Sequence, residues 1–280
     1  MSSQRKVQIV LGGTSGMGLA TAIALGKQGP VLVGGRNKTR LDNAVEAMKN
    51  AGVEGYGKQC DISDKDSLDE FVKYALTIAP IGNVVNAAGV DSGSSEMIWK
   101  INVQGTINVV EAFFPYIDGS CMVNYSSITG YYYQPTPEEI DIWGDPLAAD
   151  FFDKSYQLTT TKELDPRMAF MGPEFLTYIA SKRFVQYYTA ANALRFGKKN
   201  SQIFSVAPGS FDTPMIRQNS EEALEGIARG TAFGRLGRPE EMADFIIRLL
   251  EPGHEYLTGV DLILDGGKHE IGRASCRERV

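Results

Sequence analysis

Histidine is scarce in this 280-residue sequence, which contains only His254 and His269. A histidine-based zinc site and a Ser-His-Asp triad are therefore poorly supported, because each needs imidazole groups in a defined arrangement. Cysteine is rare too, and Cys60, Cys121 and Cys276 are scattered at spacings that match no metal-binding pattern. We expect no metal site and, since three scattered cysteines suit a reducing compartment, a cytoplasmic protein.

Long apolar runs and an excess of basic residues are also missing. No apolar stretch approaches the ~20 residues that span a bilayer, and the polar residues 1–6 do not begin a signal peptide. The formal net charge of −6 argues against a nucleic-acid partner, because phosphate binding favours a basic surface. The hydrophobic share of 43% is ordinary for a globular protein. We therefore expect a small-molecule partner, with no nucleic acid and no membrane span.

A glycine-rich turn follows the first apolar segment. Residues 7–11 form a short β-branched run typical of a buried strand, Gly12, Gly16 and Gly18 follow at once, and residues 19–28 have a helical pattern. Strand, turn and helix in this order place backbone N–H groups and a helix N-terminus against a phosphate. A tight turn without a ligand is the alternative interpretation.

The second predicted strand, residues 31–36, ends in Gly35 and Arg36. An acidic residue here would accept a hydrogen bond from a ribose 2′-hydroxyl, whereas a basic residue accommodates a 2′-phosphate. Because arginine forms forked hydrogen bonds to phosphate oxygens, we expect NADP(H) to be favoured over NAD(H). The alternative is that Arg36 is only a surface charge.

Strand and helix patterns alternate along the chain. Further strands are predicted at 54–59, 83–89, 119–126, 202–207 and 260–264, and further helices at 41–50, 64–78, 96–116, 173–197 and 239–251. Asp61, after the third strand, could accept a hydrogen bond from an adenine amino group or close a turn. The alternation predicts an α/β fold with a parallel sheet, helices on both faces and ligands at the carboxyl ends of the strands.

Two residues on the helix predicted at 173–197 form a chemically suggestive pair. Tyr178 and Lys182 are four positions apart and therefore share a helix face. A free tyrosine titrates near ~10, and a neighbouring positive charge lowers that pKa towards the range of a general acid–base. The spacing alone is weak, since a chance pair on a solvated face is common.

Together these motifs resemble the short-chain dehydrogenase/reductase family over most of residues 6–267. The carrying motifs, in chain order, are Gly12, Gly16, Gly18, Asp61, Asn86 to Gly89, Asn102, Ser127, Tyr178, Lys182, Pro208, Gly209, Thr213, Pro214, residues 235–240 and residues 265–267. Leu11 and Ala87 depart from the usual pattern. The resemblance implies a single-domain Rossmann fold over residues 1–268, a doubly wound seven-stranded parallel sheet in the order 3-2-1-4-5-6-7, and a homodimer or homotetramer.

The resemblance also implies a catalytic set. Tyr178 would exchange a proton with the substrate oxygen, and Ser127 would hydrogen-bond that oxygen. Lys182 would bind the nicotinamide ribose and lower the pKa of Tyr178, and Asn102 would hold a water that connects Lys182 to solvent. These roles suit an enzyme that interconverts a secondary alcohol and a ketone with NADP(H).

Binding residues follow from the same resemblance. Those implied for the cofactor are Gly12, Thr14, Ser15, Gly16, Met17, Gly18, Arg36, Asp61, Ile62, Asn86, Ala87, Ala88, Gly89, Tyr178, Lys182, Pro208, Gly209 and Thr213. Those implied for the substrate are Ser127, Tyr178, Phe211 and Met215, the last two on a loop at about 209–233 that folds over substrate. Core packing is an equal alternative for Phe211 and Met215.

An unusually long segment separates Ser127 from Tyr178. The extra residues, about 131–171, resemble an insertion in the 3α-hydroxysteroid dehydrogenase/carbonyl reductase branch, which suggests a steroid or another bulky ketone as substrate. An aromatic wall for the substrate, a subunit contact and an inert surface excursion all remain open. Short helices are predicted at 145–154 and 162–168.

Two other functions remain as alternatives: a catalytically silent NAD(P)-binding sensor or scaffold, and a family member that acts on a sugar or acyl substrate. The tail at 269–280 has no apolar period and follows a natural stopping point. We expect it to be non-native and either disordered or peripheral.

Overall fold

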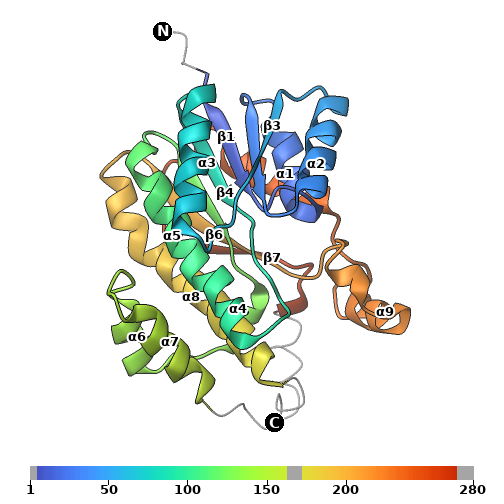
Figure 1. Cartoon of the computed structure of the whole chain (residues 1–280). Coiled ribbons are helices and arrows are strands. Elements are labelled where there is room, and N and C mark those ends of the chain that lie inside the picture. Colours follow the sequence, from blue (N-terminus) through green and yellow to red (C-terminus); the bar gives the residue numbers. More distant parts are fainter. Residues whose placement is uncertain (1–4, 163–171, 270–280) are drawn as a thin grey trace.

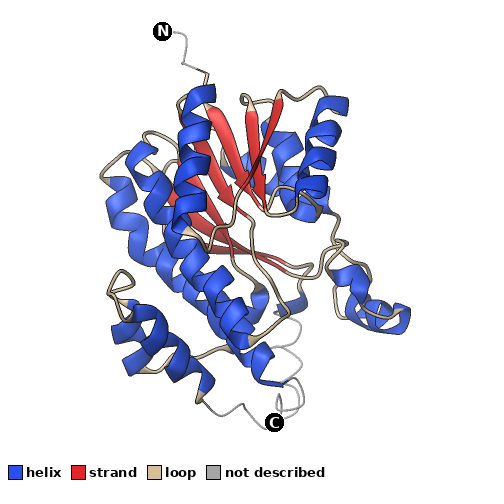
Figure 2. Cartoon of the chain, viewed as in Figure 1, coloured by secondary structure: helices blue, strands red, loops and turns tan. Residues whose placement is uncertain are grey.

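A seven-stranded parallel sheet forms the centre of the molecule (Figures 1 and 2). The computed structural model describes residues 5–162 and 172–269. The strands are β1 (Val7–Leu11), β2 (Val31–Gly35), β3 (Gly55–Gln59), β4 (Ile81–Asn86), β5 (Cys121–Tyr125), β6 (Gln202–Pro208) and β7 (Asp261–Leu264). Their order is β3-β2-β1-β4-β5-β6-β7, and every neighbouring pair is parallel. The expected fold, sheet order and single domain are confirmed.

Helices cover both faces of the sheet, as Figure 1 shows. One apolar core lies between the sheet and the helices α3 (Lys65–Ile78), α5 (Gly105–Phe113) and α8 (Gly172–Gly197). The other lies beneath α1 (Gly16–Leu25), α2 (Lys38–Asn50) and α10 (Pro239–Leu249). The central strands are buried on both faces, which explains their continuous apolar runs. This arrangement leaves the carboxyl ends of the strands free to build a site.

The helix predicted at 96–116 is interrupted. It consists of α4 (Ser95–Trp99), a π-helical turn η1 (Lys100–Gln104), α5 and a final 3₁₀ turn η2 (Phe114–Tyr116). In the π turn the N–H of Gly105 bonds to the carbonyl of Lys100, five residues back. Such turns are rare and are often found at functional sites. This one carries Asn102, one of the residues implied in catalysis.

Two short helices follow β5, but not at the predicted positions. After the 3₁₀ turn η3 (Ile128–Tyr132) come α6 (Pro137–Trp143) and α7 (Phe151–Thr160). The predicted helix at 145–154 is wrong over its first half, where the chain turns instead. The predicted helix at 162–168 lies, apart from Lys162, outside the described residues. A reciprocal capping box between Thr136 and Glu139, with Pro137 at the first helical position, begins α6.

Aromatic side chains fix α6 and α7 against α8. Tyr133, Trp143 and Phe151 are each at most 2% exposed. The rings of Trp143 and Phe151 lie 5.4 and 5.7 Å from that of Phe184 on α8. These three aromatic residues therefore belong to the core. Their rings pack the two helices against α8 and are not available as a wall for a substrate.

A buried carboxylate adds polar contacts to this packing. Glu139 is 1% exposed and accepts hydrogen bonds from Tyr133, from the backbone N–H of Thr136 at 2.7 Å and from Lys162 at 3.1 Å. The ammonium of Lys162 also lies 4.2 Å above the centre of the Tyr133 ring. A buried charge with hydrogen bonds and an opposite charge around it is tolerated in a core.

The chain after β6 stands further from the sheet. It contains the 3₁₀ turn η5 (Ile216–Gln218) and α9 (Glu221–Arg229), which buries none of its residues and projects from the body in Figure 1. Residues 270–280 of the expected tail lie outside the described residues. His269, also assigned to that tail, is 6% exposed, and its ring centre lies 5.0 Å from that of Tyr131. None of the described helices has the length and apolarity to cross a bilayer.

Candidate functional site

Close backbone packing at the carboxyl end of β1 explains the glycines of the first turn. A Cβ atom on Gly18 would lie 2.3 Å from the carbonyl oxygen of Gly12, and one on Gly12 would lie 2.6 Å from the backbone nitrogen of Ala88. Gly12 also has a φ of +76°, a conformation that side chains disfavour. The turn can therefore form only with glycine here, and it places the start of α1 beside the end of β4.

The chain after β6 closes over the same turn. A Cβ atom on Gly16 would lie 3.1 Å from the methyl group of Thr213. The glycine thus allows the segment around Thr213 and Pro214 to cross the N-terminus of α1. Sequence positions almost 200 residues apart are brought together here.

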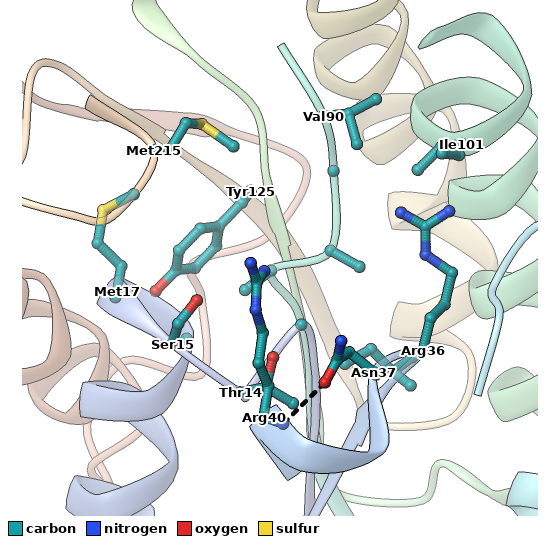
Figure 3. Close-up of a pocket in the computed structure, with 18 of the residues that line it drawn as sticks. Thr14, Ser15, Met17, Arg36, Asn37, Arg40, Val90, Ile101, Tyr125 and Met215 are labelled. Atoms are coloured by element: carbon teal, nitrogen blue, oxygen red, sulfur yellow. Dashed lines mark hydrogen bonds between the residues drawn. The ribbon is translucent and has the colours of Figure 1, made fainter. Parts of the chain in front are cut away.

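A cavity of about 420 Å³ opens at this point (Figure 3). Its lining contains most of the residues expected to bind the cofactor: Gly12, Thr14, Ser15, Gly16, Met17, Gly18, Arg36, Asp61, Ile62, Ala87, Ala88, Gly89 and Thr213. Met215, expected to bind substrate, lines it too. The volume is in the range of pockets for small molecules and cofactors. The glycine turn, the ends of β2, β3 and β4 and the chain around Thr213 therefore converge on one concave site.

Several expected binding residues lie outside this lining, and Ser127, Tyr178 and Lys182 are among them. Asn86 is 2% exposed, and its side-chain nitrogen is 3.4 Å from the hydroxyl of Thr106, so it supports the end of β4 from within. Pro208 and Gly209 are absent from the lining as well. Phe211 is 5% exposed and packs in the core, where a Cβ atom on Gly237 would lie 2.7 Å from its ring. It is a core residue and not a wall of the pocket, as the alternative interpretation held.

Two arginines lie at one end of the cavity. Arg36 follows β2, and Arg40 is in the first turn of α2; Figure 3 shows both side chains beside the cavity. Asn37 caps α2 by accepting a hydrogen bond from the backbone N–H of Arg40 at 2.9 Å. Arg40 is not among the residues predicted from the sequence, although its place in the first turn of the helix that follows Arg36 was an available signal.

Asp61 uses one carboxylate oxygen to close a turn. Its Oδ1 accepts hydrogen bonds from the backbone N–H and the hydroxyl of Ser63 at 2.9 and 2.7 Å. Asp61 also lines the cavity. Closing the turn and binding an adenine amino group are therefore compatible roles for Asp61, because Oδ2 takes no part in the bonds to Ser63.

Asn102 is clamped by its surroundings. It is 1% exposed; its Oδ1 accepts from the backbone N–H of Val90 at 2.9 Å, and its Nδ2 donates to the carbonyl of Val90 at 2.9 Å and to the Ser181 hydroxyl at 3.0 Å. A Cβ atom on Gly89 would lie 3.2 Å from Asn102 Oδ1 and 3.3 Å from Lys182 Nζ. Asn102 and Lys182 are thus neighbours across the space that this glycine leaves open.

Ser127 and Tyr178 meet beyond the end of β5. Ser127 is 8% exposed, and its hydroxyl accepts from the backbone N–H and the hydroxyl of Thr129 at 3.2 and 3.0 Å. The side chains of Ser127 and Thr129 favour the ionised form of the Tyr178 phenol, but burial outweighs them and raises its pKa overall. The serine and the tyrosine, 51 positions apart in the chain, therefore lie beside each other.

Lys182 is buried beneath this group. It is 7% exposed, and its ammonium donates to the carbonyl of Tyr125 at 3.1 Å and lies 5.9 Å from the centre of the Tyr178 ring. Burial lowers the pKa of Lys182 from 10.5 to about 8, while the carboxylates of Asp91 and Asp261 act in the opposite direction. The amine is thus close to the range in which it can release a proton.

The pKa of Tyr178 is raised, and Lys182 is not among the groups that shift it. Burial raises the pKa of Tyr178 above 10.0, and the charge of Asp91 adds to this, despite the hydrogen bonds from Ser127 and Thr129. The physical reason is that desolvation disfavours both the phenolate and the ammonium, and the ammonium points to the Tyr125 carbonyl. In this state the phenol is a proton donor at neutral pH.

Comparison with known proteins agrees with this arrangement. The family model for short chain dehydrogenase matches residues 6–137, and a second one, described as enoyl-(acyl carrier protein) reductase, matches residues 167–269. The chain belongs to the short-chain dehydrogenase/reductase family. Members of this family bind NAD(P) and are oxidoreductases, so this chain is an enzyme of that class.

Relatives of this short-chain dehydrogenase/reductase span nearly its whole length. A 3-oxoacyl-acyl-carrier-protein reductase of Thermotoga maritima is 27% identical, over 95% of this chain and 99% of the relative. A 3β-hydroxysteroid dehydrogenase of Mediterraneibacter gnavus is 26% identical, over 94% of each chain. A solved actinorhodin polyketide ketoreductase with NADPH is similar in fold, with a TM-score of 0.74 at 24% identity, over 95% of this chain and 97% of that one.

Proposed function

We propose that this enzyme interconverts a secondary alcohol and a ketone with NADP(H). The observation that carries the proposal is the meeting of Ser127, Tyr178, Lys182 and Asn102 beside the cavity that the glycine turn lines. The cofactor fits the chain's residues, because the glycine turn leaves a cradle that a Cβ atom would fill and N–H groups at the start of α1 suit a diphosphate. Bound there, the nicotinamide would supply or accept the hydride.

The chain's own groups would handle the proton. Ser127 would hold the substrate oxygen, and Tyr178 would donate its proton to that oxygen as a ketone is reduced. The raised pKa of Tyr178 keeps this donor protonated at neutral pH. Lys182, with its pKa near 8, would return a proton to Tyr178. Asn102, fixed by Val90 and Ser181, would keep a proton path between Lys182 and solvent in place.

The direct test of this mechanism is Tyr178→Phe. The change removes one hydroxyl and keeps the ring, so NADPH should bind within about twofold of wild type, as measured by fluorescence titration, while ketone reduction should fall at least ~100-fold. Thr177→Ser on the same helix is buried and serves as a matched control for packing. Undiminished reduction by the phenylalanine variant would refute the assigned role. Wild-type binding of NADPH without turnover of any carbonyl tested would favour the silent sensor.

We propose that Arg36 and Arg40 together select NADP(H). Two guanidinium groups at one end of the cavity suit a 2′-phosphate, which a ribose hydroxyl cannot replace. Replacing either arginine by alanine should weaken NADPH binding roughly tenfold and leave NADH binding within twofold. Arg229→Ala, on the exposed helix α9, is the control. Equal losses for both cofactors would contradict this assignment.

The substrate is proposed to be a bulky carbonyl compound, with a hydroxysteroid as the first candidate. A hydroxysteroid dehydrogenase and 3-oxoacyl reductases are among the relatives, and Met215 and Val90 supply apolar surface to the cavity. A screen of 3-ketosteroids against 3-oxoacyl thioesters, followed by NADPH absorbance, separates the two classes. Turnover of thioesters alone would exclude the steroid and favour the acyl alternative.

A further inference from the structure

Asp261, at the start of β7, accepts four hydrogen bonds, from the turn after β5 and from β6, η3 and α8. Its Oδ1 accepts from the Ser126 hydroxyl at 2.6 Å and from the Ser205 hydroxyl at 2.5 Å. Its Oδ2 accepts from the Tyr131 hydroxyl at 2.8 Å and from Nε2 of Gln186 at 3.1 Å. A carboxylate has about four acceptor positions, so this one is fully used. None of the four donors carries a charge, and the negative charge is therefore solvated by the protein and not neutralised by these partners.

Gln186 connects this carboxylate to the backbone of Ser127. The same Nε2 lies 3.1 Å from the Ser127 carbonyl, and Oε1 of Gln186 accepts from Arg183 at 3.0 Å, which fixes the orientation of the amide. The approach is close: a Cβ atom on Gly130 would lie 2.9 Å from Nε2. α8, which carries Tyr178, is thus tied to the backbone that carries Ser127.

Ser126 provides a second connection to the same turn. Its hydroxyl lies 3.0 Å from the carbonyl of Val206 as well as 2.6 Å from Asp261. The residue immediately before Ser127 is therefore held to β6 and β7 at once. Because Ser127 must stand within hydrogen-bonding distance of a substrate oxygen, a small rotation of this turn would misplace its hydroxyl.

We propose that Asp261 is a positioning residue for the catalytic set, which fixes Ser127 through Gln186 and Ser126 and places a negative charge behind Lys182. This inference rests on the proposed function, since it assigns a task within the same site. Gln186, which donates to Asp261, follows Lys182 by one turn of α8, so the carboxylate lies on the same side of this helix as the amine. Asp261 and Asp91 both favour the protonated form of Lys182. The neighbouring phenols of Tyr125 and Tyr178 have raised pKa values and stay neutral.

Two variants separate the charge from the hydrogen bonds. Asp261→Asn keeps the shape and removes the charge, and its neighbouring hydroxyls can rotate to accept from the new amide. Gln186→Leu keeps the charge and breaks the link to Ser127. Asp69→Asn makes the same charge change on α3, in a salt bridge with Lys65, and serves as the control.

The first readout needs no turnover. The free energy of unfolding between pH 7 and 9 is compared, in each background, with and without Lys182→Met, which isolates the titration of Lys182. Asp261→Asn should lower the pKa of Lys182, whereas Gln186→Leu and Asp69→Asn should leave it in place. An unmoved titration in Asp261→Asn would overturn the electrostatic half of the proposal, whether or not the enzyme reduces ketones.

The second readout is kcat and KM for the ketone that the wild type reduces. Asp261→Asn and Gln186→Leu should each lower kcat roughly tenfold with KM within about twofold, because the reacting groups are misaligned while binding is retained. Lower thermal stability with unchanged kcat would show a merely structural role and overturn the positioning half. If Asp261→Asn does not fold, the kcat and KM of Gln186→Leu decide the positioning half alone. If the wild type reduces no ketone, the result counts against the proposed function and not against this inference.

Discussion

Lys182→Met should make the protein more stable while it abolishes turnover. The lysine is 7% exposed, and its pKa falls from 10.5 to about 8 on folding. At 1.36 kcal/mol per pKa unit, holding the ammonium in this place costs about 3 kcal/mol at neutral pH. Methionine fills a similar volume without a charge, so the variant should gain up to about 3 kcal/mol, less the hydrogen bond to the Tyr125 carbonyl, worth about 1 kcal/mol.

The pH dependence carries the stronger test. Because the folded pKa of Lys182 is depressed, the unfolded chain binds more protons between pH 8 and 10.5, and wild-type stability gains from this group as the pH rises through that window. The advantage of Lys182→Met should therefore shrink by about 1 kcal/mol between pH 7 and 9. Other groups that titrate in this range are common to both proteins and cancel in the difference.

The assay is urea unfolding followed by tryptophan fluorescence at several pH values, together with ketone reduction at saturating NADPH. We expect a loss of turnover of at least ~100-fold in the variant. A stability difference that is independent of pH would refute the reasoning, because it would mean that the buried amine has an ordinary pKa. A Lys182→Met variant that is less stable than wild type at pH 7 would also contradict the reasoning, because burying the ammonium would then not destabilise the wild type.

Three further outcomes follow from packing. Gly18→Ala puts a methyl group against the backbone of the glycine turn at 2.3 Å, so NADPH affinity should fall more than ~10-fold in a fluorescence titration, whereas Gly197→Ala, in open space, should bind normally. In thermal melts Glu139→Ala should lower the free energy of unfolding by about 3 kcal/mol, because it removes a buried, hydrogen-bonded carboxylate. Glu138→Ala, at an exposed position, should lower it by less than ~0.5 kcal/mol. Similar losses in the two variants would contradict a stabilising role of the Glu139 carboxylate. Burial raises the pKa of Cys60 to about 12, so its thiol should resist a disulfide reagent at pH 8 in native protein; rapid labelling seen by peptide mapping would oppose this.

The sheet was predictable because each strand carries a strong local signal. Continuous β-branched runs such as residues 7–11 and 31–33 are buried on both faces, and the alternation with helices leaves few topologies. The glycine turn was predictable for a similar reason, since three glycines between a strand and a helix have one common physical use. Here local sequence and global fold agree.

Other features depended on contacts that the sequence does not display. The seven residues of α6 are too few for a periodic signal, although the capping residues around Pro137 mark its start. The π turn at Asn102 has a helical composition and differs from an α-helix only in its hydrogen bonds. The raised pKa of Tyr178 arises from burial, which the sequence does not display. The Tyr-x-x-x-Lys spacing shows only that a lysine is near. Asp261 was read simply as part of a strand.

The segment between Ser127 and Tyr178 begins just after β5 and ends on α8, so it joins the two residues to which the proposed mechanism gives the substrate oxygen. Its helices α6 and α7 are secured to the outer side of α8 by rings and by Glu139, away from the cofactor cavity. Under the proposed mechanism Ser127 and Tyr178 must hold their positions, whereas α6 and α7 do not line the cavity. Substitutions on the solvent side of these two helices should therefore change the surface beside α8 and leave the separation of Ser127 and Tyr178 unchanged.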